Sequence, residues 1–509
     1  MLSFETRGDW VPSFRLEHVD LNSCKLGSEF PPWLQSQKGL RSLNIANTRI
    51  SDTIPTWFSS ISSQLEFLNL SHNQIHGDAS SILRLEFVLV IDLGSNNLNG
   101  PLPRISSNIV VLDLSNNSFA GSIYHFLCGN RENEIRLQDL FLDNNVLSGE
   151  IPDCWMNYKF LEAVRLENNN LTGTIPNSFG NLTSLKFLHL GKNNLSGRLP
   201  ASLQNCRELM VFDLGKNGFR GSIPTWAGKH LSNLMVLNFR SNKFRGVIPR
   251  ELCHLASLQI LDLAHNHLLG TIPSCFNNFS AMAEKSKSNN RIYYSPLNGL
   301  NLERESLVMK GREVEYSTTL HLVTSLDLSN NDIVGEIPEE LTSLLGLRSL
   351  NLSGNYLRGM IPRYIGAMGL LESLDFSVNQ LSGEIPPSIS NLTFLNHLNL
   401  SYNNLTGKIP LGPQLQTFEE SSYLGNLLCG PPLTKSCDKD GVNRTTNVEH
   451  EGKDSGGFEE NWFYLSMAFG FIVGFGAVIG PLLFNQSWRI LYFKFLDSIG
   501  HKLYDLVCK

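Results

Sequence analysis

The sequence lacks the motifs of the common enzyme classes. His450-Glu451 runs on to Asp454, so no His-Glu-x-x-His zinc motif is formed, and the chain contains no Gly-x-Ser-x-Gly run. The scattered histidines, such as His265 and His267, lack the grouping that metal ligands need. The sequence therefore predicts a protein that is not an enzyme and that has no catalytic residues, no metal site and no cofactor.

Charge is also scarce. Only 17% of the 509 residues are charged and the net charge is -6, a balance that does not indicate a nucleic-acid partner.

Cysteines are too few for a disulfide scaffold, with nine in the whole chain. Their placement is still informative, because six of them occur as close pairs. In an oxidising compartment we expect three local disulfides: Cys128 with Cys154, Cys253 with Cys275, and Cys429 with Cys437. Cys24 and Cys206 have no obvious partners and are interpreted as free thiols.

Residues 1–14 do not have the pattern expected of a signal peptide. Residues 1–14 have neither a positive n-region nor a continuous apolar h-region, and no cysteine-bearing cap precedes the first repeat. A repeat array that begins without a cap leaves an open apolar end. We therefore expect an N-terminally truncated chain or a partial gene product, the alternative being that Met1 is a wrongly chosen start.

What the sequence does contain is a repeat, seen most clearly in residues 161–176, LEAVRLENNNLTGTIP. Its frame is Leu-x-x-Leu-x-Leu-x-x-Asn-x-Leu-x-Gly-x-Ile-Pro. The frame asparagine recurs, mostly every 24 or 25 residues, at Asn73, Asn96, Asn117, Asn145, Asn169, Asn193, Asn217, Asn242, Asn266, Asn331, Asn355, Asn379 and Asn403. Two degraded copies carry Cys24 and Thr48 there. Fifteen copies of this signature predict a leucine-rich-repeat solenoid.

The physical chemistry of the frame explains its residues. Val164 and Leu166 alternate as in a short strand and point into the core, while Arg165 between them points to the concave face. The asparagine amide is expected to pair with backbone groups that burial would otherwise leave unsatisfied. Gly173 permits the bend that follows. No repeat closes a core alone, so stability comes from stacking.

The concave positions of the central repeats are rich in charge. For any one residue a solvated surface is the simpler interpretation, but the set spans adjacent repeats and suits a protein or peptide ligand. The candidate ligand-binding residues are Glu162, Arg165, Glu167, Lys186, His189, Lys192, Asp213, Lys216, Arg240 and Asp262.

An island interrupts the repeats, because the asparagine spacing jumps to 65 residues between Asn266 and Asn331, which implies an insertion of about 41 residues. Repeats are assigned to residues 1–273, about eleven of them, the island to 274–322 and four repeats to 323–410. Alternating apolar residues late in the island predict a hairpin packed against the solenoid. The candidates for contact, with simple packing equally open, are Tyr293, Tyr294, Lys310 and Tyr316.

The C-terminal part changes character several times. Residues 411–437 lose the frame and read as a cap, and 438–461 form an acidic spacer. The uncharged run from Trp462 to Phe484 is long enough to cross a membrane, and the basic residues of the tail, 485–509, place the C-terminus in the cytoplasm. Two small-xxx-small pairs suit close helix packing: Gly470 with Gly474, and Gly476 with Gly480.

Asn-x-Ser/Thr sequons are numerous, and eleven precede the apolar run. Some follow from the repeat itself, yet their number fits a glycosylated extracellular region at the plasma membrane. They are Asn69, Asn116, Asn170, Asn181, Asn194, Asn278, Asn351, Asn391, Asn399, Asn404 and Asn443.

Together, the Gly-x-Ile-Pro frame, the island before the last four repeats, the segment YLGNLLCGPPLTKSC, the acidic spacer, the glycine-rich run and the short basic tail resemble a plant leucine-rich-repeat receptor-like protein of the ethylene-inducing xylanase receptor type. The resemblance implies an immune receptor that binds a microbial protein or peptide. It also implies an adaptor receptor kinase bound through the membrane helix, and a somatic-embryogenesis-type co-receptor kinase contacted through a Lys-x5-Tyr motif, here Lys310 and Tyr316.

Three other functions remain open. A secreted inhibitor of microbial hydrolases uses the same repeat, but the apolar run disfavours it. A developmental receptor for an endogenous peptide shares every feature named above. A truncated decoy without signalling is the third alternative.

Overall fold

The computed structural model describes residues 2–4, 10–61, 64–83, 85–129, 135–284, 293–294, 301–302, 304–317 and 319–437. The chain divides into the units Met1–Asp438 and Lys439–Lys509, and the second unit lies outside the described residues. No helix in the described part of the chain is long and apolar enough to cross a membrane. The predicted span 462–484, its glycine pairs and the tail fall outside that part and stay predictions.

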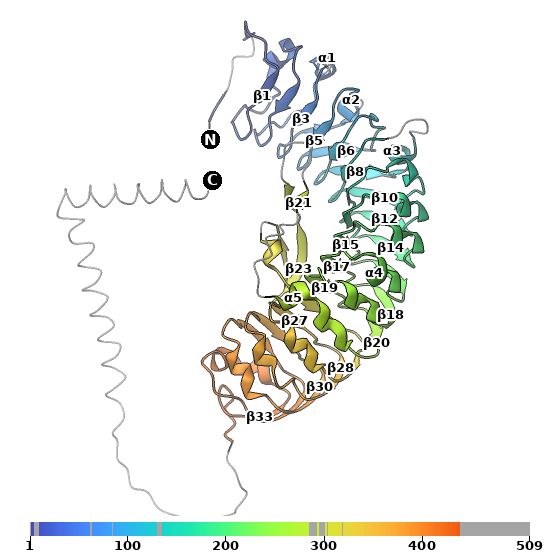
Figure 1. The fold of residues 1–509 in the computed structure, drawn as a ribbon. Coiled ribbons are helices and arrows are strands. Elements are labelled where there is room, and N and C mark those ends of the chain that lie inside the picture. The colour runs from blue at the N-terminus through green and yellow to red at the C-terminus, as the bar shows by residue number, and fades with distance from the viewer. Residues whose placement is uncertain are drawn as a thin grey trace, which may run out of the picture. The chain divides into compact units, whose positions relative to one another are not determined.

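The first unit is a curved stack of turns (Figure 1). Its concave face is one parallel sheet of fifteen short strands, so the fifteen repeats inferred from the sequence are confirmed. In order these are β1 His18–Asp20, β2 Ser42–Asn44, β3 Phe67–Asn69, β5 Val90–Asp92, β7 Val111–Asp113, β9 Asp139–Phe141, β11 Ala163–Arg165, β13 Phe187–His189, β15 Val211–Asp213, β17 Val236–Asn238, β19 Ile260–Asp262, β25 Ser325–Asp327, β27 Ser349–Asn351, β29 Ser373–Asp375 and β31 His397–Asn399.

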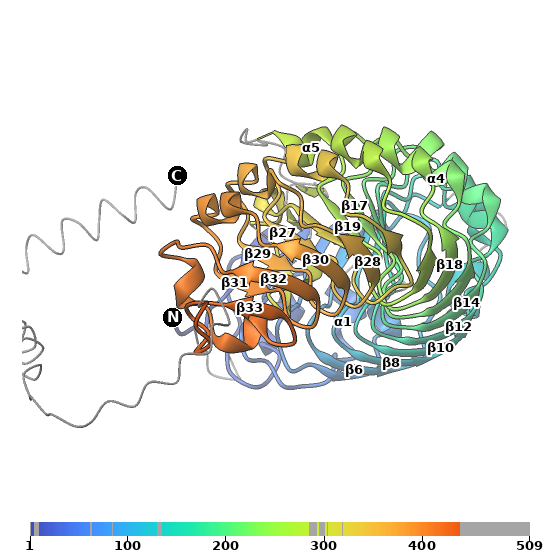
Figure 2. The same cartoon turned by 90° about the horizontal axis from the view of Figure 1, so that it is seen from below.

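A second layer of strands follows the frame asparagine in each turn and forms a lateral sheet. Figure 2 shows several of its strands, such as β14 and β18, on the outer side of the curve, and α4 (Thr225–His230) at its rim. Its nine-stranded part contains β4 His76–Gly77, β6 Asn97–Gly100, β8 Ser118–Gly121, β10 Val146–Glu150, β12 Asn170–Gly173, β14 Asn194–Gly197, β16 Gly218–Gly221, β18 Lys243–Val247 and β20 His267–Leu269. Its five-stranded part contains β26 Val334–Gly335, β28 Tyr356–Gly359, β30 Gln380–Glu384, β32 Asn404–Lys408 and β33 Leu427–Cys429.

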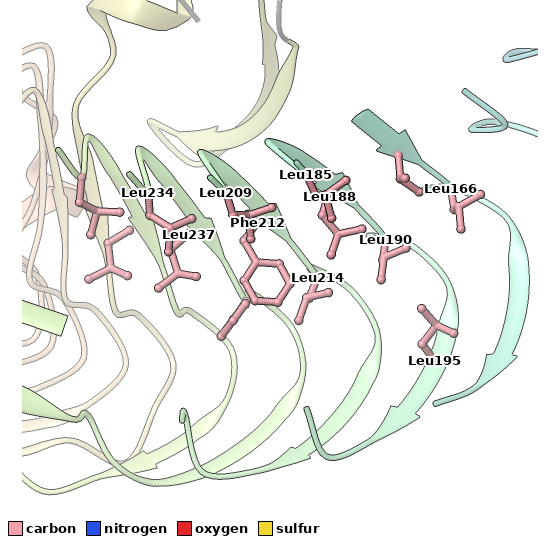
Figure 3. Close-up of a cluster of buried hydrophobic side chains, with 14 of the residues drawn as sticks. Leu166, Leu185, Leu188, Leu190, Leu195, Leu209, Phe212, Leu214, Leu234 and Leu237 are labelled. Atoms are coloured by element: carbon pink, nitrogen blue, oxygen red, sulfur yellow. The ribbon is translucent and has the colours of Figure 1, made fainter. Parts of the chain in front are cut away.

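The frame leucines fill the space between the two sheets and the outer turns. Figure 3 shows Leu188, Leu190 and Leu195 of one turn next to the corresponding residues of its neighbours. These three side chains are fully buried, and the same holds for Val164 and Leu166, as the alternation predicted. The core is continuous along the stack, because each turn covers the next.

The asparagine ladder is confirmed at the atomic level. Asn169 Nδ2 lies 3.0 Å from the carbonyl oxygen of Leu142 in the preceding turn and donates further hydrogen bonds to two carbonyls of its own turn. Its Oδ1 accepts from the backbone N–H of Leu147 at 3.0 Å. The amide therefore satisfies buried backbone groups of two turns at once. Gly173 has a φ of 81°, a value that glycine adopts without steric strain.

The island leaves this stack without breaking it. β19 pairs directly with β25, with Ile260 opposite Ser325. Asn331 donates to the carbonyl of Leu263, 68 residues earlier, at 3.0 Å and accepts from the N–H of Leu268 at 3.0 Å. The two turns on either side of the island are thus bonded as neighbours.

The island starts later than the predicted boundary at residue 274. The segment η6 (Ser274–Asn278) and helix α5 (Ser280–Ala283) still belong to the repeat, because Ala281 N donates to Ala256 O at 3.0 Å and Gly346 N donates to Met282 O at 2.8 Å. The described parts of the island are β21 Tyr293–Tyr294, β22 Asn301–Leu302, and a hairpin of β23 Glu305–Met309 and β24 Arg312–Tyr316.

Disulfides lie where the sequence placed them. Cys128 is bonded to Cys154, Cys253 to Cys275 and Cys429 to Cys437, whereas Cys24 and Cys206 are free thiols. The last disulfide joins β33, which extends the lateral sheet beyond β32, to the segment that follows it. Tyr423 is buried in the same region and donates its hydroxyl to the carbonyl of Leu415 at 2.9 Å.

Candidate ligand-binding groove

The island hairpin packs on the concave face of the solenoid, close to β15, β17 and β19 (Figure 1). Leu307 and Met309 of β23 are buried there. They form one apolar cluster with side chains of the concave strands and of the segment after the hairpin, with Tyr316 packed against it: Phe141, Ala163, Phe187, Val211, Met235, Val236, Ile260, Leu320 and Val323. The predicted packing of a hairpin against the solenoid is confirmed.

Two sets of ion pairs hold the hairpin in place. Glu313 of β24 lies 2.7 Å from Lys216 Nζ and 3.0 Å from Lys192 Nζ. The hydrogen bond from Lys216 lowers the pKa of the Glu313 carboxyl. Partial burial opposes this effect, and the hydrogen bond from Lys192 adds to it. At the hairpin turn, Lys310 Nζ lies 3.2 Å from Glu372 Oε2, and Arg348 holds the same carboxylate at 2.7 Å.

A groove of about 640 Å³ remains between the hairpin and the concave face. One wall is formed by turns from Ser71 to Arg240, and the other by hairpin residues such as Ser306 and Val308. Its lining is mostly polar and it is open to solvent. The hairpin thus converts part of a shallow concave surface into a walled groove.

Carboxylates line this groove and are hard to ionise. Burial, followed by repulsion from Asp113, raises the pKa of Asp92 to about 7. Burial also raises the pKa of Asp113. Burial and then Glu167 raise the pKa of Asp143, and burial raises that of Asp213 to about 6 against the opposing effect of His189. Ligand charge and pH will both act on these side chains.

Arg240 at the end of the groove bridges two acids. Its Nη1 lies 2.9 Å from Asp327 Oδ2 and 3.1 Å from Asp262 Oδ2. Burial alone lowers the pKa of Arg240, but the two carboxylates outweigh burial and raise it. Burial and then repulsion from Asp327 raise the pKa of Asp262 to about 7, although the charge of Arg240 lowers it. The Arg240 guanidinium therefore has a structural role, because it links the turns on either side of the island.

The candidate residues differ in how accessible they are. The expectation of a solvated set is wrong for Arg165, His189 and Asp262, which are only 8%, 2% and 5% exposed. Stacking under neighbouring side chains explains this for Arg165, which lies over the Phe141 ring at 5.7 Å from its centroid.

The other candidates are partly exposed, but several are engaged within the protein. Lys192 and Lys216 bind the hairpin, and Lys186 pairs with Glu162 at 2.7 Å. Glu167 and Asp213 line the groove. Of the four residues singled out in the island, Lys310 and Tyr316 lie on the hairpin, whereas the side chains of Tyr293 and Tyr294 fall outside the described residues.

The apolar part of the hairpin's docking surface was missed by the sequence analysis. The strand position before the first core leucine is apolar in eight turns, and five consecutive ones lie in the hairpin's cluster: Ala163, Phe187, Val211, Val236 and Ile260. Apolar side chains on a face expected to be wet require a cover. This row of apolar side chains is therefore the sequence feature that could have located the hairpin's docking surface.

The sequons fall on several faces. Asn69, Asn351 and Asn399 end concave strands, as predicted. Their Oδ1 atoms accept hydrogen bonds from the serine hydroxyl of the same sequon at 2.7, 2.8 and 2.7 Å. Asn170, Asn194 and Asn404 begin lateral strands, and Asn116, Asn181, Asn278 and Asn391 are exposed. Asn443 lies outside the described residues.

Metal binding has no support in the described ranges, where no group of three or more His, Cys, Asp or Glu side chains is arranged to hold an ion.

Two leucine rich repeat family models match parts of the chain. One leucine rich repeat model matches residues 14–75 and 207–268. A second matches residues 108–130, 160–182, 184–206, 322–344, 346–368, 370–392 and 394–414. The matches fall on both sides of the island.

Curated relatives extend the match to almost the whole chain. Receptor-like protein EIX2 of Solanum lycopersicum is 50% identical over 98% of this chain and 50% of its own length. Receptor-like protein EIX1 of the same species is 48% identical over 98% of this chain and 49% of its own length. The chain thus spans about half the length of these two relatives.

Solved structures with a similar fold include ectodomains of plant receptor kinases. The GASSHO1/SCHENGEN3 ectodomain of Arabidopsis thaliana, solved with CASPARIAN STRIP INTEGRITY FACTOR 2, has a TM-score of 0.65 and 30% identity, covering 83% of this chain and 48% of that one. The Arabidopsis HAESA structure with the peptide hormone IDA and the co-receptor SERK1 has a TM-score of 0.59 and 29% identity, covering 81% and 65%. The repeat, the island and these relatives together show that the chain belongs to the plant leucine-rich-repeat receptor-like proteins, of the type represented by EIX1 and EIX2.

Proposed function

We propose that this protein is a cell-surface receptor-like protein of plant defence. It binds an extracellular microbial protein or peptide along the concave face and signals through partner receptor kinases. The single observation that carries the proposal is the groove between the concave strands and the island hairpin, which has the length of several turns and a polar, partly charged lining. A walled groove of this kind suits an extended segment of polypeptide.

The hairpin supplies the second part of the proposal. Lys310 sits at its turn with a φ of 55° and is about one third exposed, and Tyr316 is only partly buried. A ligand that enters the groove contacts the hairpin wall, so its presence reaches these two side chains through one short element. We assign them to contact with a somatic-embryogenesis-type co-receptor kinase, and the HAESA structure with SERK1 supports this kind of assembly.

The membrane helix predicted at residues 462–484 supplies the third part. Gly470, Gly474, Gly476 and Gly480 would allow an adaptor receptor kinase to pack closely against it. This arrangement places the signalling enzyme on a partner.

A developmental receptor for an endogenous peptide is the alternative that a specific observation favours. The HAESA ectdomain, 29% identical with a TM-score of 0.62, was solved with a peptide hormone. The two functions share the groove and differ in the ligand alone.

Co-immunoprecipitation from leaves tests the proposal. The full 509-residue chain is expressed with a supplied signal peptide and challenged with purified fungal xylanase, a microbial extract, a plant peptide fraction or buffer. We expect constant adaptor binding, and co-receptor recruitment only with the microbial samples. Recruitment by plant peptide fractions alone would favour the developmental function, and adaptor binding without any recruitment would indicate a decoy.

Matched variants separate the parts. Ser306→Trp fills the groove from the hairpin side, whereas Val314→Trp adds the same bulk at an exposed position outside the groove lining. We expect only the first to abolish recruitment. Lys310→Ala with Tyr316→Ala should weaken recruitment with the adaptor still bound, and Gly474→Leu with Gly480→Leu should weaken adaptor binding. Loss of both partners in the hairpin variant would contradict the assignment.

A further inference from the structure

Cations line up on the lateral sheet, away from the concave groove. Arg220 of β16 is the direct partner of Lys243 on β18. Arg198 follows Gly197, which pairs with Phe219 next to Arg220. Arg198, Arg220 and Lys243, called here the cation row, therefore cross three neighbouring strands in a straight line. Parallel strands are ~4.8 Å apart, which sets the spacing of the three charges.

The row is exposed and uncompensated. All three side chains are exposed, and within the described part of the chain none of them makes an ion pair or a side-chain hydrogen bond. A Cβ on Gly221 would lie 3.2 Å from Cγ of Arg198, so the stem of Arg198 leans over β16 toward Arg220. Like charges opposite each other destabilise a sheet.

The surroundings of the row are equally distinctive. Arg245 stands next to it on β18, opposite His267. Small hydroxyl residues occupy the neighbouring outward positions, among them Thr174, Ser196 and Ser222. Val247 and Leu269 are paired neighbours on β18 and β20 and are 62% and 48% exposed. The surface thus combines regularly spaced cations, hydroxyl groups and a small apolar platform.

We propose that the cation row binds an extended acidic polysaccharide, a polymer of uronic acid residues. Such a chain carries one carboxylate on each sugar ring, and a regular row of guanidinium and ammonium groups matches a regular row of carboxylates. The hydroxyl residues match sugar hydroxyls, and the apolar pair matches the C–H face of a ring. A lipid surface is disfavoured, because the exposed apolar side chains beside the row are a single pair, Val247 and Leu269, which offers little area to bury in a membrane.

This site is independent of the groove. The lateral strands and the concave strands are different sheets, so a polysaccharide on the row leaves the groove open. Binding there would hold the receptor against an acidic polymer matrix while the concave face samples proteins.

The test uses the full glycosylated chain, purified from plant cells in mild detergent, and immobilised polygalacturonate as the probe. Fully methyl-esterified pectin serves as the uncharged control. We expect binding to polygalacturonate alone, weakening steeply as salt rises. The triple variant Arg198→Gln, Arg220→Gln, Lys243→Gln should bind at least tenfold more weakly and melt at the same temperature or higher.

The matched control variant removes the same charges elsewhere. Lys38, Arg207 and Arg250 are exposed, and their replacement by glutamine should leave binding within about twofold of wild type. Equal loss in both triple variants would reduce the effect to net charge and overturn the proposal. It would also be overturned by no binding of polygalacturonate, or by binding of anionic phosphatidylserine vesicles in place of it.

Discussion

At the scale of single residues, the frame asparagine explains why the repeats tolerate so much sequence variation elsewhere. Asn169 makes four hydrogen bonds to backbone groups of its own turn and the preceding one. The residue type was predictable from the spacing, because few side chains donate and accept at once on so short a stem. The sequence could not show that Thr48 would only partly replace it: its hydroxyl lies 2.9 Å from Ile45 O of its own turn and 3.1 Å from Asn73 Oδ1 of the next, two contacts in place of four.

Asn169→Ala should therefore be strongly destabilising. Each buried backbone group left without a partner costs ~1–3 kcal/mol, so we expect the free energy of unfolding to fall by about 3 kcal/mol or more. Chemical denaturation of the solenoid measures this. Asn177→Ala, eight residues later and exposed, is the control, and an equal loss in both variants would contradict the ladder's role.

Arg240→Met removes the bridge between Asp262 and Asp327 and leaves two buried carboxylates side by side. Breaking one partner out of a buried ion pair costs ~3–5 kcal/mol. We expect a loss of this size in denaturation. Arg41→Met, which removes an exposed pair with Glu66 at 3.3 Å, should cost less than ~1 kcal/mol. A loss for Arg240→Met as small as that of Arg41→Met would show that the buried bridge is not stabilising.

At the scale of elements, the island hairpin was predictable from alternating apolar residues, but its site of docking was not. Leu307 and Met309 are buried as the alternation suggested, whereas Val314 is 40% exposed. The difference arises because β23 packs against the concave strands while β24 uses Glu313 to reach Lys192 and Lys216. Because these contacts join residues far apart in the sequence, the docking site is indicated only indirectly, by the apolar side chains on the outward face of the concave strands.

Leu307→Asp with Met309→Asp should release the hairpin. Two charges in the apolar cluster cannot be solvated there, and the ion pairs of Glu313 are too exposed to hold the hairpin alone. We expect fast amide hydrogen exchange in residues 305–316 with an unchanged melting temperature of the solenoid. Val314→Asp should exchange as wild type does. Slow exchange in the double variant would mean that the charge pairs dominate.

At the scale of the whole molecule, the number of turns and the concave sheet follow from the repeat frame, whereas the lateral sheet was not predicted. The accessibility of the candidate site does not follow from the frame, because it depends on the island folding back over it. Phe187 and Val211 occupy outward positions of the concave strands, yet they are buried in one cluster with Leu307 and Met309 of the hairpin. Prediction from a repeat is reliable for what each turn does to its neighbours and fails for what a distant segment does to all of them.

The concave acids predict a pH dependence of stability. Burial raises the pKa of Asp92 to about 7, with Asp113 adding to it. Burial and then Glu162 raise that of Asp139 to about 7, against Lys186 and Arg165. Between pH ~4 and ~7 the folded protein holds protons that the unfolded chain has released, so stability falls as pH rises through this window.

The melting temperature should accordingly be higher at pH 5 than at pH 7.5 at equal ionic strength. Asp139→Asn should reduce the difference, and Asp20→Asn, at an exposed position of β1, should not. A melting temperature that rises between pH 5 and pH 7.5 would contradict this assignment.

The closed ladder across the island has one more consequence. Because β19 and β25 are bonded as direct neighbours, the length of the island does not affect how the turns stack. The island is therefore an interchangeable segment. The island can therefore be replaced by that of a relative, which alters the groove wall and leaves the stack of turns beneath it unchanged. Receptors of this design can therefore diversify recognition at one insertion point while inheriting their stability unchanged.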